Sequence, residues 1–322
     1  MKRILVIQTA FLGDVILATP VLSELNRLFP GAKLDMLVKK GNESLLLNNP
    51  HLHELFVLNK SNGKWKAIFG LIKEFRQNNY DLVINLHRFG SSGLITALSK
   101  GKKRYGFRKN PFSFLYTKRF DHKIGDGTHE VERNLSVISE FGTEKKVRPE
   151  LFPSQKDFDA IQPFVNENYY CIAPASVWFT KQLPAEKWVE LTHTLESDST
   201  IYVLGAPSDK ELGDVIIEQS THENIENLAG RLSLLQSAAL MKSATRSFVN
   251  DSGPLHLASS MNANVTAFFC STIPDFGFGP LSDDSKILQV EGLDCRPCGI
   301  HGHKACPKGH FKCSQIELID SH

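Results

Sequence analysis

An acidic residue, Asp14, interrupts a mostly apolar N-terminal stretch, MKRILVIQTAFLGDVILATP. It follows Gly13 in a turn between an apolar run at residues 2–7 and a helical pattern, and a glycine there lets the backbone approach a ligand closely. A carboxylate at such a place can take a proton from a substrate hydroxyl as a general base. An acid in the first turn of a helix also complements the helix dipole, so position alone leaves both interpretations open.

A lysine and two hydroxyl side chains occur together in the second half of the chain. Ser176, Thr180 and Lys181 lie in the loop between an apolar run at 169–174 and a helical pattern, AEKWVELTHTLES. A lysine is a compact positive charge and hydroxyl groups donate to phosphate oxygens, so this loop suits a diphosphate. A solvated surface lysine is the alternative interpretation.

Two further apolar runs end in polar side chains. Asp209 follows the run at 200–205, where it can accept hydrogen bonds from ribose hydroxyls or cap the next helix. The run at 247–250 is followed by the segment DSGP at 251–254, which opens a helix that carries His256. Backbone N–H groups at such an opening can hold a phosphate. His256 either contacts substrate or is a satisfied, half-buried histidine.

Short apolar runs alternate with helical patterns along the whole chain. The predicted strands lie at residues 2–7, 33–38, 53–58, 81–86, 169–174, 200–205, 247–250 and 264–269, with a clear helix at 65–77. Short buried runs that alternate with helices indicate parallel sheets built from β–α–β units. We therefore predict an α/β fold in which ligands bind at the carboxyl ends of the strands.

A length of 322 residues favours two domains. The sequence turns polar and proline-containing around residues 145–156, and a fresh series of strands and helices begins at Tyr169. We predict one domain over residues 1–155 and a second over 156–322, which ends in a cysteine-rich segment.

The charge balance argues against a protein built mainly to bind nucleic acid, because 37 basic and 35 acidic residues leave a net charge of only +2. The charge is uneven, however. Between Lys100 and Lys123, nine lysines and arginines accompany one acid, Asp121, and several aromatic residues. This basic run is either a solvated loop or a patch for an anionic acceptor and a membrane surface.

The N-terminus has the basic start and apolar run of a signal peptide, but Asp14 interrupts the run and no convincing cleavage site follows. No stretch approaches the ~18 apolar residues of a membrane span. We expect a soluble, cytoplasmic protein.

Four of the six cysteines crowd into CRPCGIHGHKACPKGHFKC, at Cys295, Cys298, Cys306 and Cys313. Thiolates and imidazoles at this density fit a structural zinc site. Disulfides are disfavoured in a cytoplasmic enzyme, and a metal-free, thiol-rich loop is the alternative.

Taken together, these segments resemble the ADP-heptose:lipopolysaccharide heptosyltransferases, glycosyltransferase family 9. The similarity rests on ILVIQTAFLGDVILATPVLSEL, APASVWFTKQLPAEKWVEL, NLAGRLSLLQSAALMKSA, FVNDSGPLHLASSMNANVTAFF and STIPDFGFGP, which occur in the family's order. They cover most of both halves of the chain, and residues 39–128 match least distinctly.

The resemblance implies a GT-B architecture: two facing Rossmann-like domains with parallel sheets and a cleft, the first binding mainly the acceptor and the second the donor. It also implies an inverting reaction that requires no metal or other cofactor, with Asp14 as the general base. The implied donor-binding residues are Ser176, Thr180, Lys181, Asp209, Leu232, Asp251, Ser252, Gly253 and His256. Gly13 and Arg104 are the candidates on the acceptor side.

The expected function is therefore transfer of heptose, or a related sugar, from an ADP-sugar to a lipopolysaccharide core or similar glycan, with peripheral contact to the inner membrane. Two departures from the family leave other donors open. Asp209 is shorter than the family's frequent glutamate, and Trp178 and Phe179 are bulky for a phosphate loop. A non-catalytic nucleotide-sugar-binding module would keep the Lys181 loop but would not need Asp14.

Overall fold

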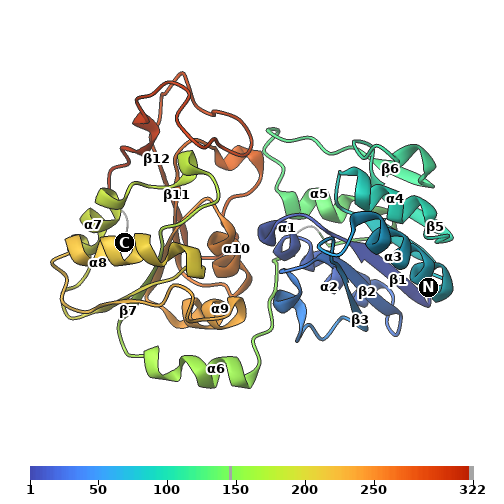
Figure 1. The fold of residues 1–322 in the computed structure, drawn as a ribbon, viewed down its shortest axis with the longest axis horizontal. Helices are drawn as coiled ribbons and strands as arrows, with labels where there is room; N and C mark the ends of the chain where they lie inside the picture. Colours follow the sequence, from blue (N-terminus) through green and yellow to red (C-terminus); the bar gives the residue numbers. More distant parts are fainter. Residues whose placement is uncertain (145–146, 319–322) are drawn as a thin grey trace. The chain divides into compact units, whose positions relative to one another are not determined.

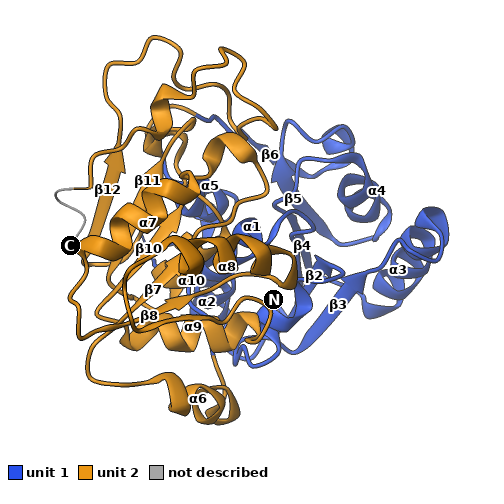
Figure 2. Ribbon diagram, turned by 60° about the vertical axis from the view of Figure 1, so that its left-hand side comes forward, with its two compact units in different colours: residues 1–124, 128–152 blue, residues 125–127, 153–322 orange. Residues whose placement is uncertain are grey.

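The computed structural model of the chain describes residues 1–144 and 147–318. These residues form two compact units, which Figure 2 colours separately. Unit 1 comprises Met1–Ile124 and Thr128–Phe152, and unit 2 comprises Gly125–Gly127 and Pro153–His322. Each unit is a parallel sheet covered by helices, the layered arrangement that alternating strands and helices predict.

Unit 1 is built on a six-stranded sheet in the order β3-β2-β1-β4-β5-β6, and all its strand pairs are parallel (Figure 1). The strands are β1 (Arg3–Ile7), β2 (Lys33–Lys39), β3 (Glu54–Leu58), β4 (Leu82–Asn85), β5 (Lys103–Phe107) and β6 (Lys118–Phe120). The helices are α1 (Leu12–Ile16), α2 (Thr19–Leu28), α3 (Lys64–Asn78), α4 (Gly90–Leu98) and α5 (Glu130–Ser136), with 3-10 turns η1 (Glu43–Leu46), η2 (Ser113–Leu115) and η3 (Ser139–Phe141).

The sheet of unit 2 repeats this topology, in the order β12-β11-β10-β7-β8-β9. Its strands are β7 (Tyr169–Ala173), β8 (Thr200–Val203), β9 (Ile225–Asn227), β10 (Arg246–Asn250), β11 (Val265–Phe269) and β12 (Ser285–Gln289). The helices are α6 (Gln155–Ile161), α7 (Ala185–Thr194), α8 (Lys210–Gln219), α9 (Leu234–Ser243) and α10 (Gly253–Ser260). The 3-10 turns are η4 (Gln162–Phe164), η5 (Phe179–Lys181), η6 (Pro207–Asp209), η7 (Pro274–Phe276) and η8 (Lys312–Ser314).

Each unit has its own apolar core. In unit 1, α3 turns Ile68, Ile72 and Phe75 toward Leu5 and Ile7 of β1, so the helical period of its apolar residues matches the buried strand. In unit 2, the fully buried Trp188 of α7 packs edge-on against Phe268 of β11, and its indole N–H donates to a backbone carbonyl oxygen.

Both sheets contain a switch point, where the strand order reverses direction. It lies between β1 and β4 in unit 1 and between β7 and β10 in unit 2. Open parallel sheets bind ligands just beyond the carboxyl ends of the strands at such a point, because the loops on its two sides diverge. The carboxyl edges of β1, β4, β7 and β10 are therefore the places to look for a site.

The predicted strands are confirmed to within two residues at each end, and so is the predicted helix at 65–77, observed as α3. The predicted first helix is interrupted, because α1 ends at Ile16 and α2 begins at Thr19. Pro20 has no N–H to continue the helical hydrogen bonds, and the Thr19 hydroxyl donates to the Ile16 carbonyl oxygen at 2.8 Å instead.

The basic run at 100–123 is not the solvated loop of the first interpretation. It contains β5, η2 and β6, so Lys102 and Lys103 lie at the amino end of β5 while Arg108 and Lys109 follow its carboxyl end. Much of its charge is paired: Lys102 with Asp81, Arg108 with Asp121, and Lys118 with Glu140. The run is therefore not one continuous patch.

The predicted linker at 145–156 includes two residues, 145 and 146, that lie outside the described residues. Residues 147–154 contain no helix or strand, and α6 begins at Gln155, where the Ser154 hydroxyl accepts a hydrogen bond from the Asp157 N–H. No helix in the described ranges 1–144 and 147–318 is long and apolar enough to cross a membrane.

Candidate functional site

Asp14 lies in the first turn of α1, just beyond the carboxyl end of β1 and beside the switch point of unit 1. It is half-buried, and its Oδ2 accepts a hydrogen bond from the Phe11 N–H at 3.1 Å. Burial, followed by the negative charge of Glu130, raises the pKa of Asp14 to about 6, although the Phe11 N–H and Arg88 act in the opposite direction. A carboxyl group with a pKa near neutrality is suited to accept a proton during a reaction.

His87 and Arg88 follow β4 on the other side of this switch point. His87 Nδ1 lies 2.8 Å from the Thr9 hydroxyl, which ties the loops after β1 and β4 together. Burial, helped by the charges of Arg88, Lys60 and Lys39, lowers the pKa of His87 to about 4, so its imidazole is neutral at pH 7. Sequence reasoning missed this pair, although its place directly after the predicted strand at 81–86 was a usable signal.

A buried charge cluster at the start of α5 acts on Asp14. Glu130 has both carboxylate oxygens 3.0 Å from His122 Nε2, and its Oε2 accepts a hydrogen bond from Arg133 Nε at 2.7 Å; all three side chains are buried. Burial raises the pKa of Glu130, but His122 and Arg133 outweigh it, so the pKa is lowered overall and the carboxylate stays charged. Nothing in the local sequence pattern pointed to Glu130, because its partners come together only in the fold.

Lys181 and Asp251 meet at the switch point of unit 2. Lys181 leaves the loop after β7, Asp251 follows β10, and Lys181 Nζ lies 2.7 Å from Asp251 Oδ2, with both side chains largely buried. The Thr272 hydroxyl, which follows β11, donates to the same carboxylate oxygen at 2.6 Å. Asn250, at the end of β10, connects this strand to the loop after β7. Its side chain accepts a hydrogen bond from the Leu183 N–H and donates one to the Pro174 carbonyl oxygen.

Thr180 was predicted to contact the donor, but its side chain is buried inside unit 2. Its side chain is fully buried, and its hydroxyl lies 3.0 Å from the Ser271 hydroxyl and accepts a hydrogen bond from the His303 N–H at 2.7 Å. The His303 carbonyl oxygen in turn accepts from the Thr180 N–H. The cysteine-rich segment therefore packs against η5 and holds the Lys181 loop in position, which its sequence did not indicate.

The other predicted donor residues all lie along the carboxyl edge of the same sheet. Ser176, Leu232, Ser252 and Gly253 are half-buried, in the segments that follow β7, β9 and β10. Asp209, after β8, accepts hydrogen bonds from the Ala206 N–H and the Ser208 hydroxyl, so it is a cap in this structure.

Gly205 has a clear steric role beside this cap. A side chain at Gly205 would meet the Cβ of Asp209 at 2.9 Å, so the close turn after β8 requires a glycine. His256 in α10 is 5% exposed, so it is more deeply buried than the half-buried histidine that was the alternative to a substrate contact.

Arg104, a predicted acceptor-side residue, lies within β5. Its guanidinium donates to the carbonyl oxygens of Leu115 and Gly101, so it supports the crossover to β6. Gly13 is half-buried in α1, next to Asp14.

The predicted zinc site receives no support from the arrangement of the cysteines. Among the described residues, one group of three possible ligands has its ligand atoms within 4.8 Å of one another, and it is Asp35, His53 and Glu54. The Arg3 guanidinium lies 2.6 Å from Asp35 and 2.9 Å from Glu54, so this group is an ion-pair cluster. The cysteines are free thiols, and burial raises the pKa of Cys313 to about 11, with the neighbouring cysteines adding to the shift.

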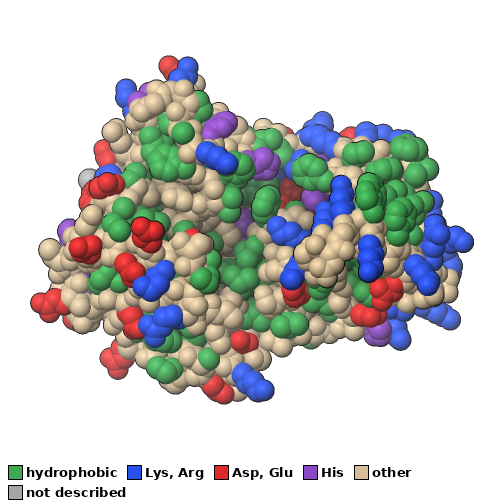
Figure 3. All heavy atoms as spheres, viewed as in Figure 1, with side chains coloured by type: hydrophobic (Ala, Val, Ile, Leu, Met, Phe, Trp, Pro, Cys, Tyr) green, Lys and Arg blue, Asp and Glu red, His purple; other side chains and the backbone are tan. Residues whose placement is uncertain are grey.

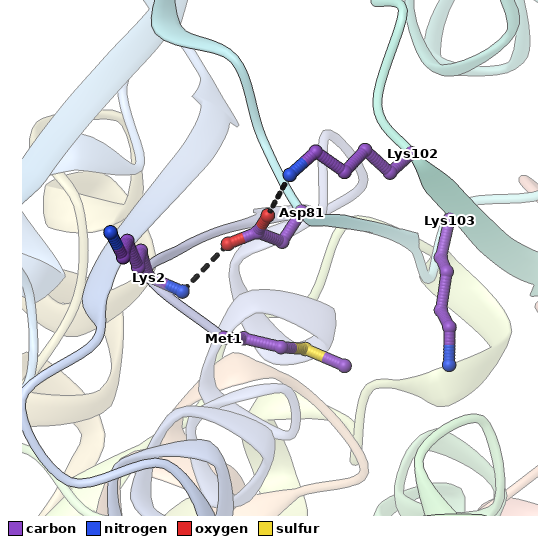
Figure 4. Close-up of a pocket in the computed structure, with 5 residues that line it drawn as sticks. All are labelled: Met1, Lys2, Asp81, Lys102 and Lys103. Carbon is purple, nitrogen blue, oxygen red and sulfur yellow. Dashed lines mark hydrogen bonds and ion pairs between the residues drawn. The ribbon is translucent and has the colours of Figure 1, made fainter.

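A surface pocket at the opposite edge of the first sheet offers no chemistry of this kind. It is lined by Met1, Lys2, Asp81, Lys102 and Lys103 (Figure 4). Asp81 accepts from the Lys2 backbone N–H at 2.6 Å and pairs with Lys102 at 2.7 Å. These contacts, with Lys102 the largest, lower the pKa of Asp81 to about 2. The pocket lies at the amino ends of β1, β4 and β5, away from Asp14.

Comparison with known proteins places this chain in a family. Residues 68–308 match the sequence model of glycosyltransferase family 9 (heptosyltransferase), a match that includes the Lys181 and Asp251 loops and begins after Asp14. Lipopolysaccharide heptosyltransferase 3 of Escherichia coli K12 is 33% identical over 287 residues, which is 81% of this chain and 80% of the relative.

Solved structures share the fold. A family 9 glycosyltransferase from Veillonella parvula superposes with a TM-score of 0.79 at 24% identity, over 89% of this chain and 85% of that one. The ADP-heptose lipopolysaccharide heptosyltransferase II of E. coli superposes with a TM-score of 0.78 at 23% identity, over 92% of this chain and 96% of that one. The two Rossmann-like units are therefore those of a GT-B fold, and this chain belongs to glycosyltransferase family 9 and is a glycosyltransferase.

Proposed function

We propose that this protein transfers heptose, or a closely related sugar, from an ADP-sugar to a lipopolysaccharide core acceptor. The observation that carries the proposal is the pair of switch-point sites: a half-buried carboxyl group with a pKa near 6 in unit 1, and a lysine loop suited to a diphosphate in unit 2. The names of the similar proteins supply the sugar, the nucleotide and the acceptor class.

In the proposed reaction, Asp14 takes the proton of an acceptor hydroxyl, and that oxygen attacks the anomeric carbon of the donor sugar. The bond between this carbon and the diphosphate oxygen breaks, and the nucleoside diphosphate leaves with the bonding electrons. Attack from the face opposite the leaving group inverts the anomeric configuration. General-base assistance of this kind contributes about 10²- to 10⁴-fold to the rate.

The leaving diphosphate gains negative charge as the bond breaks, and Lys181 with the backbone N–H groups at the start of α10 would stabilise that charge without a metal ion. Lys181 is paired with Asp251 in the structure, so a diphosphate competes with a carboxylate for the ammonium group. Thr272 remains as a partner for Asp251 when Lys181 turns to the donor.

We assign the acceptor to the N-terminal domain, residues 1–155, and the donor to the C-terminal domain, residues 156–322. Within the donor site, Ser176 contacts the diphosphate and Leu232 the adenine. Asp209 holds the ribose, because its carboxylate can accept further hydrogen bonds beside the two that make it a cap. All three lie along the carboxyl edge that carries Lys181, with Leu232 half-buried as an apolar contact for a base requires. A cytoplasmic location stays a prediction.

A binding panel tests the donor assignment. We expect ADP-heptose to bind more tightly than ADP-glucose, UDP-glucose or GDP-mannose in calorimetric titrations, and a lipopolysaccharide core lacking the transferred heptose to accept the sugar. The panel includes other nucleotide-sugars because Asp209 is shorter than the glutamate frequent in the family, which leaves a different donor open. Tighter binding of a UDP- or GDP-sugar would replace the ADP assignment and leave the family unchanged.

The acid limb of the pH–rate profile should report Asp14. Because the base must be ionised, kcat/KM should fall as pH drops through about 6. Glu130→Gln removes a negative charge that raises the Asp14 pKa, while Arg88 and Lys39 still face Asp14. The acid limb of this variant should therefore move to lower pH.

Glu132→Gln is the matched control, since Glu132 lies on the same helix, exposed to solvent. We expect it to leave the profile in place. Glu130 is buried, so thermal denaturation of its variant is measured as well, and only the pH at which kcat/KM is half-maximal is compared. An acid limb that stays fixed in Glu130→Gln contradicts the electrostatic coupling.

A further inference from the structure

Five large apolar side chains of unit 1 are exposed to solvent and do not belong to its apolar core. Trp65 and Phe69 on α3 are 59% and 55% exposed, Phe89 before α4 is 68% exposed, and Phe114 and Leu115 in η2 are 69% and 43% exposed. We call these five residues the aromatic surface. A contiguous apolar area on an otherwise polar surface marks a contact with a partner or a membrane.

The fold brings these residues together from three segments. α3 packs against α4, and α4 packs against η2. Lys60 donates to the Ser91 hydroxyl, linking the start of α3 to α4, and Asn110 donates to the Phe89 carbonyl oxygen, linking the crossover that contains η2 to the same place. Figure 3 shows hydrophobic side chains gathered over this part of unit 1, with lysine and arginine side chains beside them.

The exposure of Trp65 and Phe69 is not a by-product of the helix packing. α3 buries a separate face against the sheet, with Ile68, Leu71 and Phe75. Trp65 and Phe69 are four residues apart on the outer face, with their rings stacked at 6.2 Å. They lie within the first two turns of α3, which follows β3, so they are near the edge at which the strands end.

Positive charge surrounds the aromatic surface. Between residues 60 and 76 there are five basic residues, Lys60, Lys64, Lys66, Lys73 and Arg76, and one acid, Glu74. Lys64 Nζ lies 5.2 Å from the centre of the Trp65 ring. Lys109, in the crossover beyond β5, is also exposed. Tryptophan and lysine together are typical of protein surfaces that rest at the headgroup level of an anionic bilayer.

We infer that the aromatic surface and its surrounding lysines dock this protein on an anionic lipid bilayer. The inference extends the proposed function, because an acceptor anchored in a membrane has to reach Asp14, and Asp14 and Phe89 both follow strands at the carboxyl edge of the same sheet. The charge complementarity selects the occupant: a neutral protein partner would need the aromatic residues but not the excess of lysines.

Co-sedimentation of the 322-residue chain with vesicles tests the inference without donor or acceptor. Vesicles of phosphatidylglycerol and phosphatidylethanolamine in equal parts should bind the protein, and phosphatidylcholine vesicles should bind it at least about tenfold less. Trp65→Ser with Phe69→Ser should lower the partition coefficient on anionic vesicles at least about tenfold. Lys64→Glu with Lys66→Glu should lower it by a similar factor, more at low salt than at high salt.

Two controls match these variants. Ile287→Ser removes an exposed apolar side chain from β12 in unit 2, and Lys33→Glu reverses an exposed lysine at the amino end of β2. Both should partition like the wild type. Equal partitioning of the aromatic variant and the wild type, or wild-type binding that is equal on neutral and anionic vesicles, overturns the inference. So does a wild-type dimer that the aromatic variant converts to a monomer while vesicle binding is absent.

Turnover separates this inference from the proposed function. With a lipid-free core oligosaccharide as acceptor, the aromatic variant should match the wild type, and with acceptor embedded in vesicles it should be slower by the same factor as its partitioning. A loss on the lipid-free acceptor as well assigns these residues to the glycan instead of the membrane. Absence of wild-type transfer to either acceptor refutes the proposed function and leaves the vesicle result standing.

Discussion

Replacing Asp14 by asparagine should lower turnover at least about a hundredfold while donor affinity stays nearly unchanged. Asparagine keeps the shape of the side chain and can still accept the hydrogen bond from the Phe11 N–H, but it cannot take a proton from an acceptor hydroxyl. Steady-state rates, with donor dissociation constants measured by calorimetry, test this directly. Turnover at the wild-type rate would show that Asp14 is only a helix-terminal acid.

The stability of this variant distinguishes the same two roles. A carboxyl group whose pKa is raised in the folded state stabilises the fold at low pH, and this contribution is lost as pH rises through about 6. At pH 7 the ionised Asp14 therefore costs stability, and Asp14→Asn should raise the free energy of unfolding by on the order of 1 kcal/mol.

Asp157 provides a matched control for this stability measurement. It occupies the same position in α6 and likewise accepts a hydrogen bond from the residue three positions before it. Asp157→Asn should leave activity intact and lower stability by up to about 1 kcal/mol, because it removes a negative charge that interacts favourably with the helix N-terminus. A stability loss in Asp14→Asn like that in Asp157→Asn would identify Asp14 as a cap.

Lys181→Met should weaken donor binding by between about tenfold and a hundredfold and slow the reaction, because a hydrogen bond between charged partners is lost. It should also lower the free energy of unfolding by about 1–3 kcal/mol, since the buried carboxylate of Asp251 loses its cationic partner and retains the Thr272 hydroxyl. Titration of the donor and thermal unfolding give the two quantities separately.

A second substitution separates the two effects of Lys181→Met. Adding Asp251→Asn removes the unpaired charge, so stability should return while donor affinity stays low. Lys187→Met, which removes a lysine from an ion pair on α7, should change neither quantity by much. A donor dissociation constant that is unchanged in Lys181→Met would refute the role of this lysine in binding the diphosphate.

The sequence determined the alternation of strands and helices and the positions of most strands. A buried strand is a run of consecutive apolar residues, so it can be recognised without knowing which strand pairs with it. The strands at β1, β7 and β10 were predictable for this reason. β5 and β6 were not, because each is short, begins with a lysine and an arginine, and lies in a basic run that resembles a loop. The position of β6 at the edge of the sheet, and the ion pairs that both strands make with Glu140, became apparent only once the sheet order was known.

The position of the candidate site at strand ends was also predictable, since a parallel sheet places every strand's carboxyl end on one edge. Asp14, Lys181 and Asp251 were all identified this way. The tertiary structure decided which partners they have: it paired Lys181 with Asp251, 70 positions away, because β7 and β10 are neighbours in the sheet. It also set Glu130 beside Asp14 and buried Thr180 under the cysteine-rich segment. Local sequence patterns show which residues along a helix or strand are buried. They do not show electrostatic partners, because these depend on which distant segments the fold brings within a few ångströms of each other.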